Sequence, residues 1–154
     1  MQLDLFDLGT YIASGNVLFD AESRPDEALI ERALAKTFGL TIPVVLRSRD
    51  EMAATVEQAP ADHGAADRRS DVMFLKAPLQ PAEAFAQLPQ LRDGVDFVAV
   101  GPGVLYFSRL KSLASTTRMT KIMEMPMYKQ MTIRTWGTVT KVTDMLEARH
   151  SADS

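Results

Sequence analysis

Residues 71–108 read DVMFLKAPLQPAEAFAQLPQLRDGVDFVAVGPGVLYFS and hold a run of strong secondary-structure signals. The apolar stretch at 71–77 is continuous, which predicts a strand that is central in its sheet or covered on both faces. Pro81 is placed to open a short helix, because proline is tolerated at the first helical position. Residues 95–108 hold two β-rich runs around a Gly-Pro-Gly turn, which predicts a hairpin. The predicted order is strand, helix, strand, strand.

The residues that follow extend this order to a known motif. We expect a helix at about 117–125, a brief strand at 132–134 and a last helix at about 136–148. The order βαββαβ is that of the ferredoxin-like motif, in which a four-stranded antiparallel sheet carries both helices on one face. The other face is expected to stay free for a partner or a ligand.

The first part of the chain repeats this order without its opening strand and helix. Residues 10–19, TYIASGNVLF, predict a hairpin around Ser-Gly-Asn. A helix is expected at 26–38, stopped by Gly39 in a left-handed cap. The β-branched stretch 41–47 predicts a strand, and the capping box at 48–51 should open a short helix.

We therefore predict an α+β protein with two ferredoxin-like (βαββαβ) halves, the first truncated at its N-terminus. The first half spans 1–60, a linker spans 61–70, and the second half with its terminal helix spans 71–154. The two hairpins should superpose, as should the helices at 26–38 and 117–125.

The composition is that of an ordinary globular protein and excludes several kinds of site. The chain has 154 residues, of which 46% are apolar and 24% charged, and it has no cysteine. Disulfides, thiolate zinc sites and cysteine nucleophiles are therefore excluded. We identify no signal peptide, and no segment approaches the roughly 20 apolar residues of a membrane-spanning helix. These features predict a cytoplasmic protein with no membrane partner.

The net charge of −3 is unevenly distributed along the chain. Residues 1–108 carry 9 Lys and Arg against 16 Asp and Glu, whereas residues 109–154 carry 8 against 4. A basic C-terminal part is compatible with an anionic partner such as nucleic acid, although the chain as a whole is acidic. An unevenly charged solvated surface explains the same split, so both interpretations stay open.

Four stretches resemble a family of bacterial proteins known as domain of unknown function 1697: TYIASGNVLF (10–19), IPVVLRSRDEM (42–52), VMFLKAP (72–78) and MTIRTWGTVTK (131–141). The resemblance covers about residues 10–146. It implies two ferredoxin-like subdomains and no established activity.

In this family a strand, a glycine-rich turn with an Arg-Gly pair and a helix precede the first hairpin, whereas about nine residues do so here. The resemblance therefore implies a missing first strand and helix. An unpaired strand edge invites other chains, so we expect an unstable monomer or a homodimer through that edge. A start further upstream is the third interpretation.

Candidate anion-binding residues lie in both halves. Residues 112–120, SLASTTRMT, surround Arg118 and precede Lys121, and the unpaired N–H groups that open a helix attract anions. Ordinary N-capping explains the same hydroxyls. In the first hairpin, Ser14 and Asn16 present a hydroxyl, an amide and backbone N–H groups, which turn formation alone also explains.

Arg134 completes the candidate anion site. Arg118 and Arg134 both belong to the last helix and strand of the second motif, so we expect them to lie near one another. Trp136 follows closely and is expected to pack against the sheet, with base stacking as the alternative.

No catalytic or metal-binding set is recognised. His63 lies in the predicted linker and His150 near the end of the chain, without the positioned partners that catalysis or metal binding needs, so mobile surface histidines are expected. Five of the nine methionines fall between Met119 and Met131, and their spacing favours core filling over a binding groove. We predict no catalytic residue, no metal and no cofactor.

Three functions remain open. The first is a non-enzymatic binding protein that acts through a free sheet face or a protein partner. The second is a small-molecule enzyme or an anion- or phosphate-binding protein with a site between the halves, built on Arg118, Lys121 and Arg134. The third is nucleic-acid binding through the basic C-terminal part. The fold alone does not choose between them.

Overall fold

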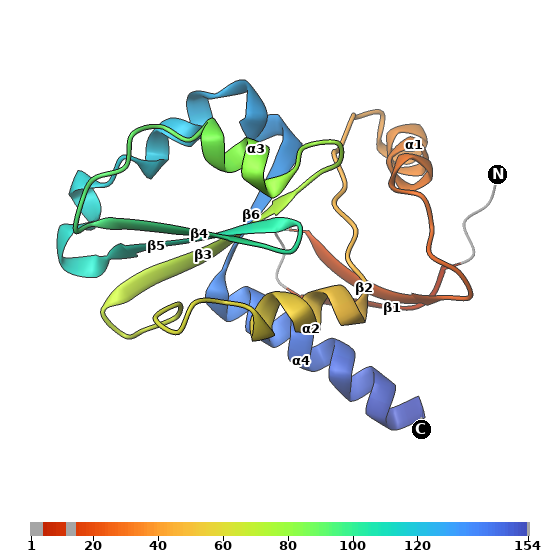
Figure 1. Cartoon of the computed structure of the whole chain (residues 1–154). Helices are drawn as coiled ribbons and strands as arrows, with labels where there is room; N and C mark the ends of the chain where they lie inside the picture. The colour runs from red at the N-terminus through yellow and green to blue at the C-terminus, as the bar shows by residue number, and fades with distance from the viewer. Residues whose placement is uncertain (1–4, 12–14, 154) are drawn as a thin grey trace.

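The computed structural model describes residues 5–11 and 15–153 (Figure 1). The elements follow in the order β1 (Leu5–Tyr11), β2 (Asn16–Ala21), α1 (Glu27–Phe38), α2 (Arg49–Glu57), β3 (Arg68–Leu75), α3 (Pro81–Ala86), β4 (Asp96–Gly101), β5 (Val104–Leu110), the 3₁₀ helices η1 (Lys111–Thr116), η2 (Met119–Glu124) and η3 (Pro126–Gln130), β6 (Met131–Thr135) and α4 (Trp136–Asp153). No helix of this described part is long and apolar enough to cross a membrane.

A four-stranded antiparallel sheet forms the centre of the molecule. Its strand order is β4-β5-β3-β6, with every neighbouring pair antiparallel. The α+β expectation is confirmed, and this order agrees with a split βαβ motif. The continuous apolar run of β3 lies in the interior of the sheet, with Val72 and Met73 almost fully buried.

Both faces of this sheet are covered, so the expected free face does not exist. Side chains alternate between the faces of a strand, and β3 and β5 are apolar at successive positions. One face carries Met73, Leu75, Leu105 and Phe107 against α3 and the 3₁₀ helices. The other carries Val72, Phe74, Val104 and Tyr106 against Met52 of α2 and Val139 of α4. Figure 1 shows α2 and α4 together on that side.

The helix predicted at about 117–125 forms only as the short 3₁₀ helix η2, and not as an α-helix. Extended backbone at Thr117 and Met125 separates η2 from η1 and η3. Pro126 follows Met125 and disfavours helical backbone at that residue. The expected superposition of this segment on the twelve-residue helix α1 therefore fails, whereas the hairpins β1–β2 and β4–β5 form as predicted.

The first part of the chain has its own two-stranded sheet, β1–β2, followed by α1 and α2. The caps of α1 form as predicted: Asp26 accepts a hydrogen bond from the Ala28 N–H, and Gly39 has a φ of 69°. The capping box of Ser48 and Glu51 is also confirmed.

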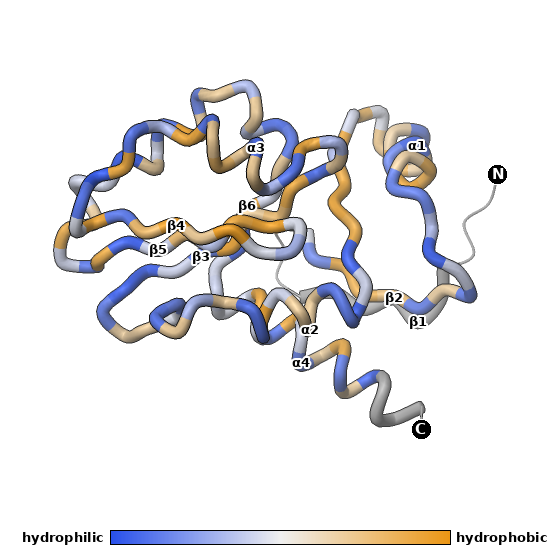
Figure 2. The backbone as a smooth tube through the Cα atoms, viewed as in Figure 1, coloured by the Kyte–Doolittle hydropathy of each residue, from blue (hydrophilic) through white to orange (hydrophobic). Residues whose placement is uncertain are grey.

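The prediction of a strand at 41–47 is wrong. Side chains, and not a neighbouring strand, bind the backbone groups of Leu46 and Val44 in this segment. Glu27 accepts the Leu46 N–H at 2.7 Å, and Lys76 donates to the Val44 carbonyl at 2.7 Å. The segment stays extended and strongly apolar, as Figure 2 shows between α1 and α2. It leads the chain from α1 to the start of α2, alongside the central sheet.

Candidate functional site

The larger of the two cavities described in this structure lies between the first part of the chain and the central sheet. It has a volume of about 540 Å³, within the range typical of small-molecule sites. Its polar lining comes from the N-terminal ends of α1 and α2 and from the residue before α3, namely Arg24, Asp26, Glu27, Arg47, Glu51 and Gln80. The loop after β3 and the β4–β5 turn close its other side with Leu79, Pro102 and Gly103.

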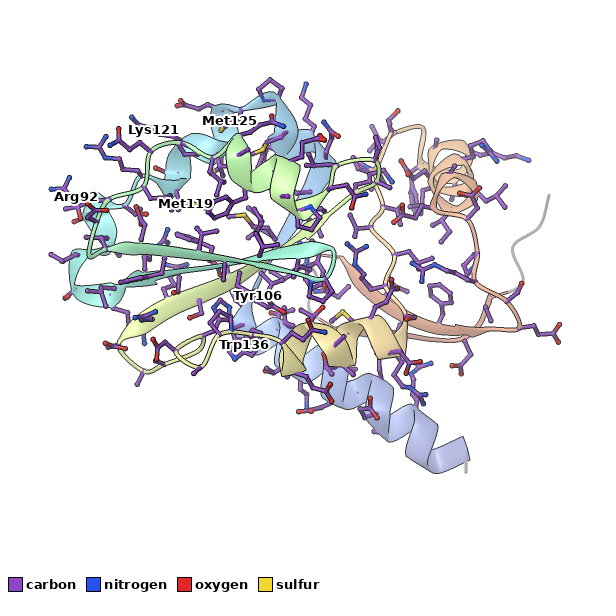
Figure 3. All side chains as sticks on the ribbon, viewed as in Figure 1. Arg92, Tyr106, Met119, Lys121, Met125 and Trp136 are labelled. Carbon is purple, nitrogen blue, oxygen red and sulfur yellow. The ribbon has the colours of Figure 1, made fainter. Side chains whose placement is uncertain are left out.

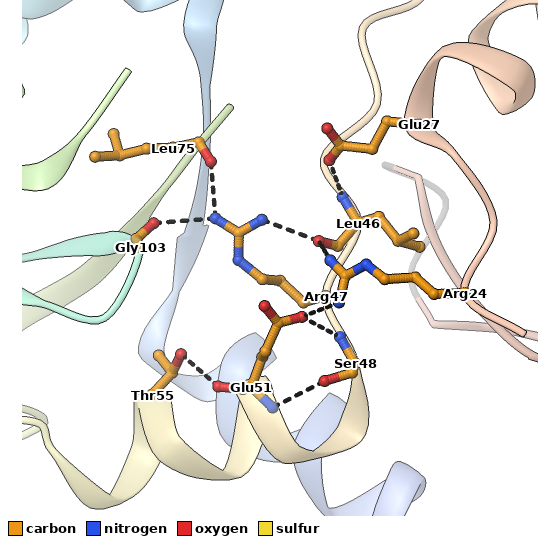
Figure 4. Close-up of polar contacts among 9 residues, drawn as sticks. All are labelled: Arg24, Glu27, Leu46, Arg47, Ser48, Glu51, Thr55, Leu75 and Gly103. Atoms are coloured by element: carbon orange, nitrogen blue, oxygen red, sulfur yellow. Dashed lines mark hydrogen bonds and ion pairs between the residues drawn. The ribbon is translucent and has the colours of Figure 1, made fainter. Parts of the chain in front are cut away.

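Arg47 is the most deeply placed cation of this cleft (Figure 4). Its Nη2 donates to the carbonyl oxygens of Leu75 at 2.7 Å and Gly103 at 3.0 Å, and its Nη1 donates to Leu46 at 2.9 Å. Burial lowers the pKa of Arg47, while Glu51 and Glu27 act in the opposite direction. Arginine nevertheless stays charged in proteins, so the cleft wall holds a positive charge bound to neutral carbonyls.

Arg24 is the cation that solvent reaches. Its Nη1 lies 2.6 Å from Oε1 of Glu51, and its side chain is 53% exposed. Glu51 Oε1 also accepts the Ser48 N–H at 2.8 Å. Burial alone would raise the pKa of Glu51, but the hydrogen bonds from Ser48 and Arg24 outweigh it and hold this pKa below its usual value. Glu51 is therefore ionised at neutral pH, with its Oε1 engaged by Arg24 and Ser48.

Lys76 ties α1 to the central sheet. Its Nζ lies 2.6 Å from Glu31 and 3.5 Å from Glu27, both on α1, and donates to Val44 as well. Burial would lower the pKa of Lys76, but these carboxylates raise it above its ordinary value. α1 itself buries none of its residues. Charged contacts therefore contribute to holding this wall of the cleft, beside the partly buried Leu29, Ile30 and Leu34.

The predicted anion-binding residues fall into two separate groups. Arg134 on β6 meets Asn16, whose Oδ1 accepts from Arg134 Nε at 2.9 Å, so these two are brought together. Arg134 Nη1 also donates to Thr132 at 2.7 Å and to Ile133 at 3.0 Å. Ser14 lies outside the described residues. This group joins the start of β2 to the edge of the central sheet.

Arg118 and Lys121 lie at the other edge, so the predicted proximity of Arg118 and Arg134 is wrong. The Arg118 N–H donates to Asp96 of β4, and β4 and β6 are opposite edge strands. Three inter-strand spacings of about 4.8 Å separate those edges, roughly 14 Å in all. Asp96 also accepts from the Thr117 hydroxyl. The hydroxyl-rich segment thus caps an internal carboxylate.

His63 is not a mobile surface residue. Its ring lies edge-on to Trp136 at 4.7 Å and to Tyr106 at 5.4 Å between centroids. Its Nε2 is buried without a hydrogen-bond partner among the described residues. Burial lowers the pKa of His63, and the charge of Arg68 lowers it further. A hydrogen bond with the Asp71 backbone raises this pKa but does not outweigh them. It borders the second cavity, of about 280 Å³, with Arg68, Phe97 and Tyr106.

The packing predicted for Trp136 is confirmed, since it packs against the core on the α2–α4 side of the sheet. Core filling by methionine is confirmed for Met119 and Met127, which are buried on the opposite side, and is wrong for Met123, which is 59% exposed. Within the described ranges no group of three or more metal-ligating side chains is found.

Sequence reasoning missed Arg24, Arg47 and Lys76. Arg47 had a usable signal, since it ends the apolar run IPVVL directly before the Ser48 capping box. A cation in that position has to leave the apolar interior or find partners there. Arg24, which lines the cleft, and Lys76, which binds α1 beside it, are placed by contacts between residues 27 and 45–49 positions apart, which no local pattern reports.

The fold is shared with the conserved bacterial protein SP0830 from Streptococcus pneumoniae. The two structures align with a TM-score of 0.73 and 23% sequence identity, over 92% of this chain and 81% of that one. This structural alignment shows a common fold, and at 23% identity it shows nothing about activity. No curated protein matches the sequence. Residues 1–106, more than half of the chain, match the family described as protein of unknown function, DUF1697. This chain therefore belongs to the DUF1697 family.

Proposed function

We propose that this protein is a non-enzymatic binding protein that takes a small organic anion in the cleft between its parts 1–60 and 71–154. The observation that carries the proposal is the partly buried guanidinium of Arg47, whose three hydrogen bonds end on neutral carbonyl oxygens. We expect it to act in the cytoplasm, a reducing compartment that a sequence without cysteine fits.

Three carboxylates, Asp26, Glu27 and Glu51, line the cleft beside Arg24 and Arg47, so the case for an anion rests on the protein donors that already engage those carboxylates. Asp26 accepts the Ala28 N–H. Glu27 is engaged with Lys76 and the Leu46 N–H, and Glu51 with Arg24 and the Ser48 N–H. These carboxylates are thus compensated by donors of the protein. The charge of Arg47 is opposed by Glu51 and Glu27 at longer range only. A carboxylate or phosphate that enters the cleft would supply Arg47 with a close partner of opposite charge.

Arg24 is suited to contact the ligand directly. A guanidinium carries five N–H donors in a planar fork that matches carboxylate and phosphate oxygens. Arg24 uses Nη1 for Glu51 and Nη2 for the Leu46 carbonyl at 3.2 Å. Because its side chain is 53% exposed, the remaining donors reach the solvent-filled part of the cleft.

Calorimetric titration with small carboxylates and phosphates tests the proposal. Arg24→Gln should weaken binding of the responding anion about tenfold or more, since a hydrogen bond to a charged group contributes roughly 1.5–3 kcal/mol. Arg32→Gln is the matched control, because Arg32 is exposed on α1 and does not line the cleft. Equal affinity of wild type and Arg24→Gln, or no binding of any of these anions at millimolar concentration, would refute the proposal.

A further inference from the structure

A buried carboxylate binds two chain segments that carry exposed cations, at one end of the edge strand β4. Asp96 is 7% exposed, and its Oδ2 accepts the backbone N–H groups of Arg92 and Arg118, each at 3.0 Å. The two backbone nitrogens therefore lie within twice that distance of each other. Thr117 donates its hydroxyl to the other oxygen, Oδ1. The backbones of Arg92 and Arg118 are thus held close together, and both residues are exposed.

The 3₁₀ geometry of η2 adds a third cation to this pair. Side chains three residues apart are eclipsed in a 3₁₀ helix, so Arg118 and Lys121 share one face, which ends at the carboxylate Glu124. The neighbouring face carries Met119 and Ile122, which are 3% and 2% exposed in the core. Figure 3 shows Arg92 and Lys121 pointing away from the sheet, whereas Met119 lies toward it.

Further cations extend this group into a row along the whole 3₁₀ layer. Residues 111–130 hold the exposed cations Lys111, Arg118, Lys121 and Lys129 and the exposed carboxylate Glu124, while Arg92 is followed by the exposed carboxylate Asp93. Among the described residues, none of these four side chains nor that of Arg92 takes part in an ion pair or side-chain hydrogen bond. Four other cations, by contrast, do form ion pairs with carboxylates from other elements: Arg24, Arg68, Lys76 and Arg149. We call the group of Arg92, Lys111, Arg118, Lys121 and Lys129 the basic row.

The basic row is extended. The layer begins after Leu110, which pairs with Arg68 at one end of β3, and ends before Met131, which pairs with Leu75 at the other. At about 3.3 Å per residue the layer spans roughly 23 Å. Exposed apolar side chains are interspersed along it: Leu113 is 43%, Met123 59% and Tyr128 36% exposed.

We propose that the basic row binds the phosphate backbone of a single-stranded nucleic acid. Unpaired cations distributed over such a length match a polymer with repeated charges better than one compact anion. Arg92 and Arg118 supply planar forks suited to phosphate oxygens. Leu113, Met123 and Tyr128 offer apolar surface to unstacked bases, which a duplex keeps in its interior. This site is separate from the cleft and does not depend on the function proposed there.

Fluorescence anisotropy with a labelled oligothymidylate, titrated with the full chain at several salt concentrations, tests this proposal. We expect binding at low salt that weakens as salt is raised. The double variant Arg118→Gln with Lys121→Gln should lower affinity at least tenfold. It should also reduce the slope of log affinity against log salt by about 1.4, since each phosphate contact contributes about 0.7 for single strands. The control double variant Arg32→Gln with Lys36→Gln removes the same charge from exposed positions of α1 and should bind as wild type.

Three results would overturn the proposal: no binding of the oligonucleotide at low salt, equal loss of affinity in both double variants, or a stronger response to duplex DNA or to polyglutamate than to the single strand. The last would assign the row to a duplex or to an acidic protein. Circular dichroism and thermal melting of each variant establish that the fold is intact, since both substituted side chains are exposed and without partners in the described chain.

Discussion

Arg47 and Gly103 are joined by a hydrogen bond between Nη2 and the carbonyl oxygen, 3.0 Å long, across 56 positions of sequence. The same nitrogen donates to Leu75 at the end of β3. One guanidinium therefore fastens the segment before α2 to the β3 end and the β4–β5 turn. Arg47, Leu75 and Gly103 all line the cleft, so this contact fixes part of its wall.

Replacing Arg47 should destabilise the protein. Arg47→Met removes a charged donor from the Leu75 and Gly103 carbonyls, and we expect a loss of roughly 2–3 kcal/mol in the free energy of unfolding. Arg49→Met is the control, because Arg49 forms only a surface contact with Asp50 at 3.6 Å and should cost less than about 0.5 kcal/mol. Urea denaturation measures both. Equal stability of the two variants would show that the hydrogen bonds of Arg47 to Leu75 and Gly103 do not stabilise the fold.

The two glycines Gly101 and Gly137 should respond in opposite directions to alanine. A methyl group at Gly101 would overlap the ring of Tyr106, 2.9 Å from Cζ, and that ring is buried and held by a hydrogen bond from its hydroxyl to Thr55 at 2.6 Å. We expect Gly101→Ala to cost roughly 1–3 kcal/mol. Gly137 in α4 has open space around it, so Gly137→Ala should stabilise by about 0.5–1 kcal/mol. Thermal melting decides, and a stabilised Gly101→Ala would contradict this packing.

His63 should make stability depend on pH in a defined window. Burial lowers its pKa in the folded state below the ordinary 6.5, so the unfolded chain takes up this proton first as the pH falls. The contribution is complete above pH 6.5 and is lost as the pH falls through 6.5 toward the lower folded pKa. His63→Phe should flatten this part of the stability profile. The lowered pKa of Glu51 affects the free energy of unfolding only below about pH 4.5, outside the window of His63. Denaturant titrations between about pH 5.5 and about 7.5 measure the free energy of unfolding of wild type and His63→Phe. The same pH dependence in both would exclude a contribution of His63.

α1 should loosen when its charged contacts are removed. Because α1 buries none of its residues, the Lys76 contacts to Glu27 and Glu31 hold it against the sheet. Lys76→Met should speed hydrogen exchange in α1 at least severalfold, while the amides of β3 and β5 keep their protection. Arg32→Met, on the exposed face of α1, is the control. Unchanged exchange in Lys76→Met would mean that another contact holds the helix.

Tyr106 provides a spectroscopic check of the core. Burial raises its pKa to about 12, so its hydroxyl should remain un-ionised through the range in which an exposed tyrosine titrates, near 10. Alkaline difference spectroscopy should show a late phase that Tyr106→Phe lacks. A wild-type curve without that phase would place Tyr106 in contact with water.

Much of the fold could be predicted from local sequence. The continuous apolar run of β3, the glycine turn between β4 and β5, and the caps at Asp26, Gly39 and Ser48 each act within a few residues, and all are confirmed. The same apolar run of β3 was compatible with a strand covered on both faces as well as with a central strand, and both hold in the structure. The expectation of a free face came from the general motif.

The site could not be predicted in the same way. Arg118 and Arg134 share one motif in sequence, but the strand order places them at opposite edges of the sheet. Segment 41–47 has the composition of a strand, yet Glu27 and Lys76 bind its backbone in place of a ladder. These outcomes depend on side chains distant in sequence, which composition and periodicity do not report.

The central claim is that a small anion binds in the cleft beside Arg47, and amide chemical shifts measured during an anion titration test it most directly. The anion that responds in calorimetry should shift the amides of Arg47, Ser48, Glu51 and Gly103, with saturation at the calorimetric affinity. Changes confined to the 3₁₀ layer around Arg118 and Lys121, or no changes at saturating anion, would contradict the account.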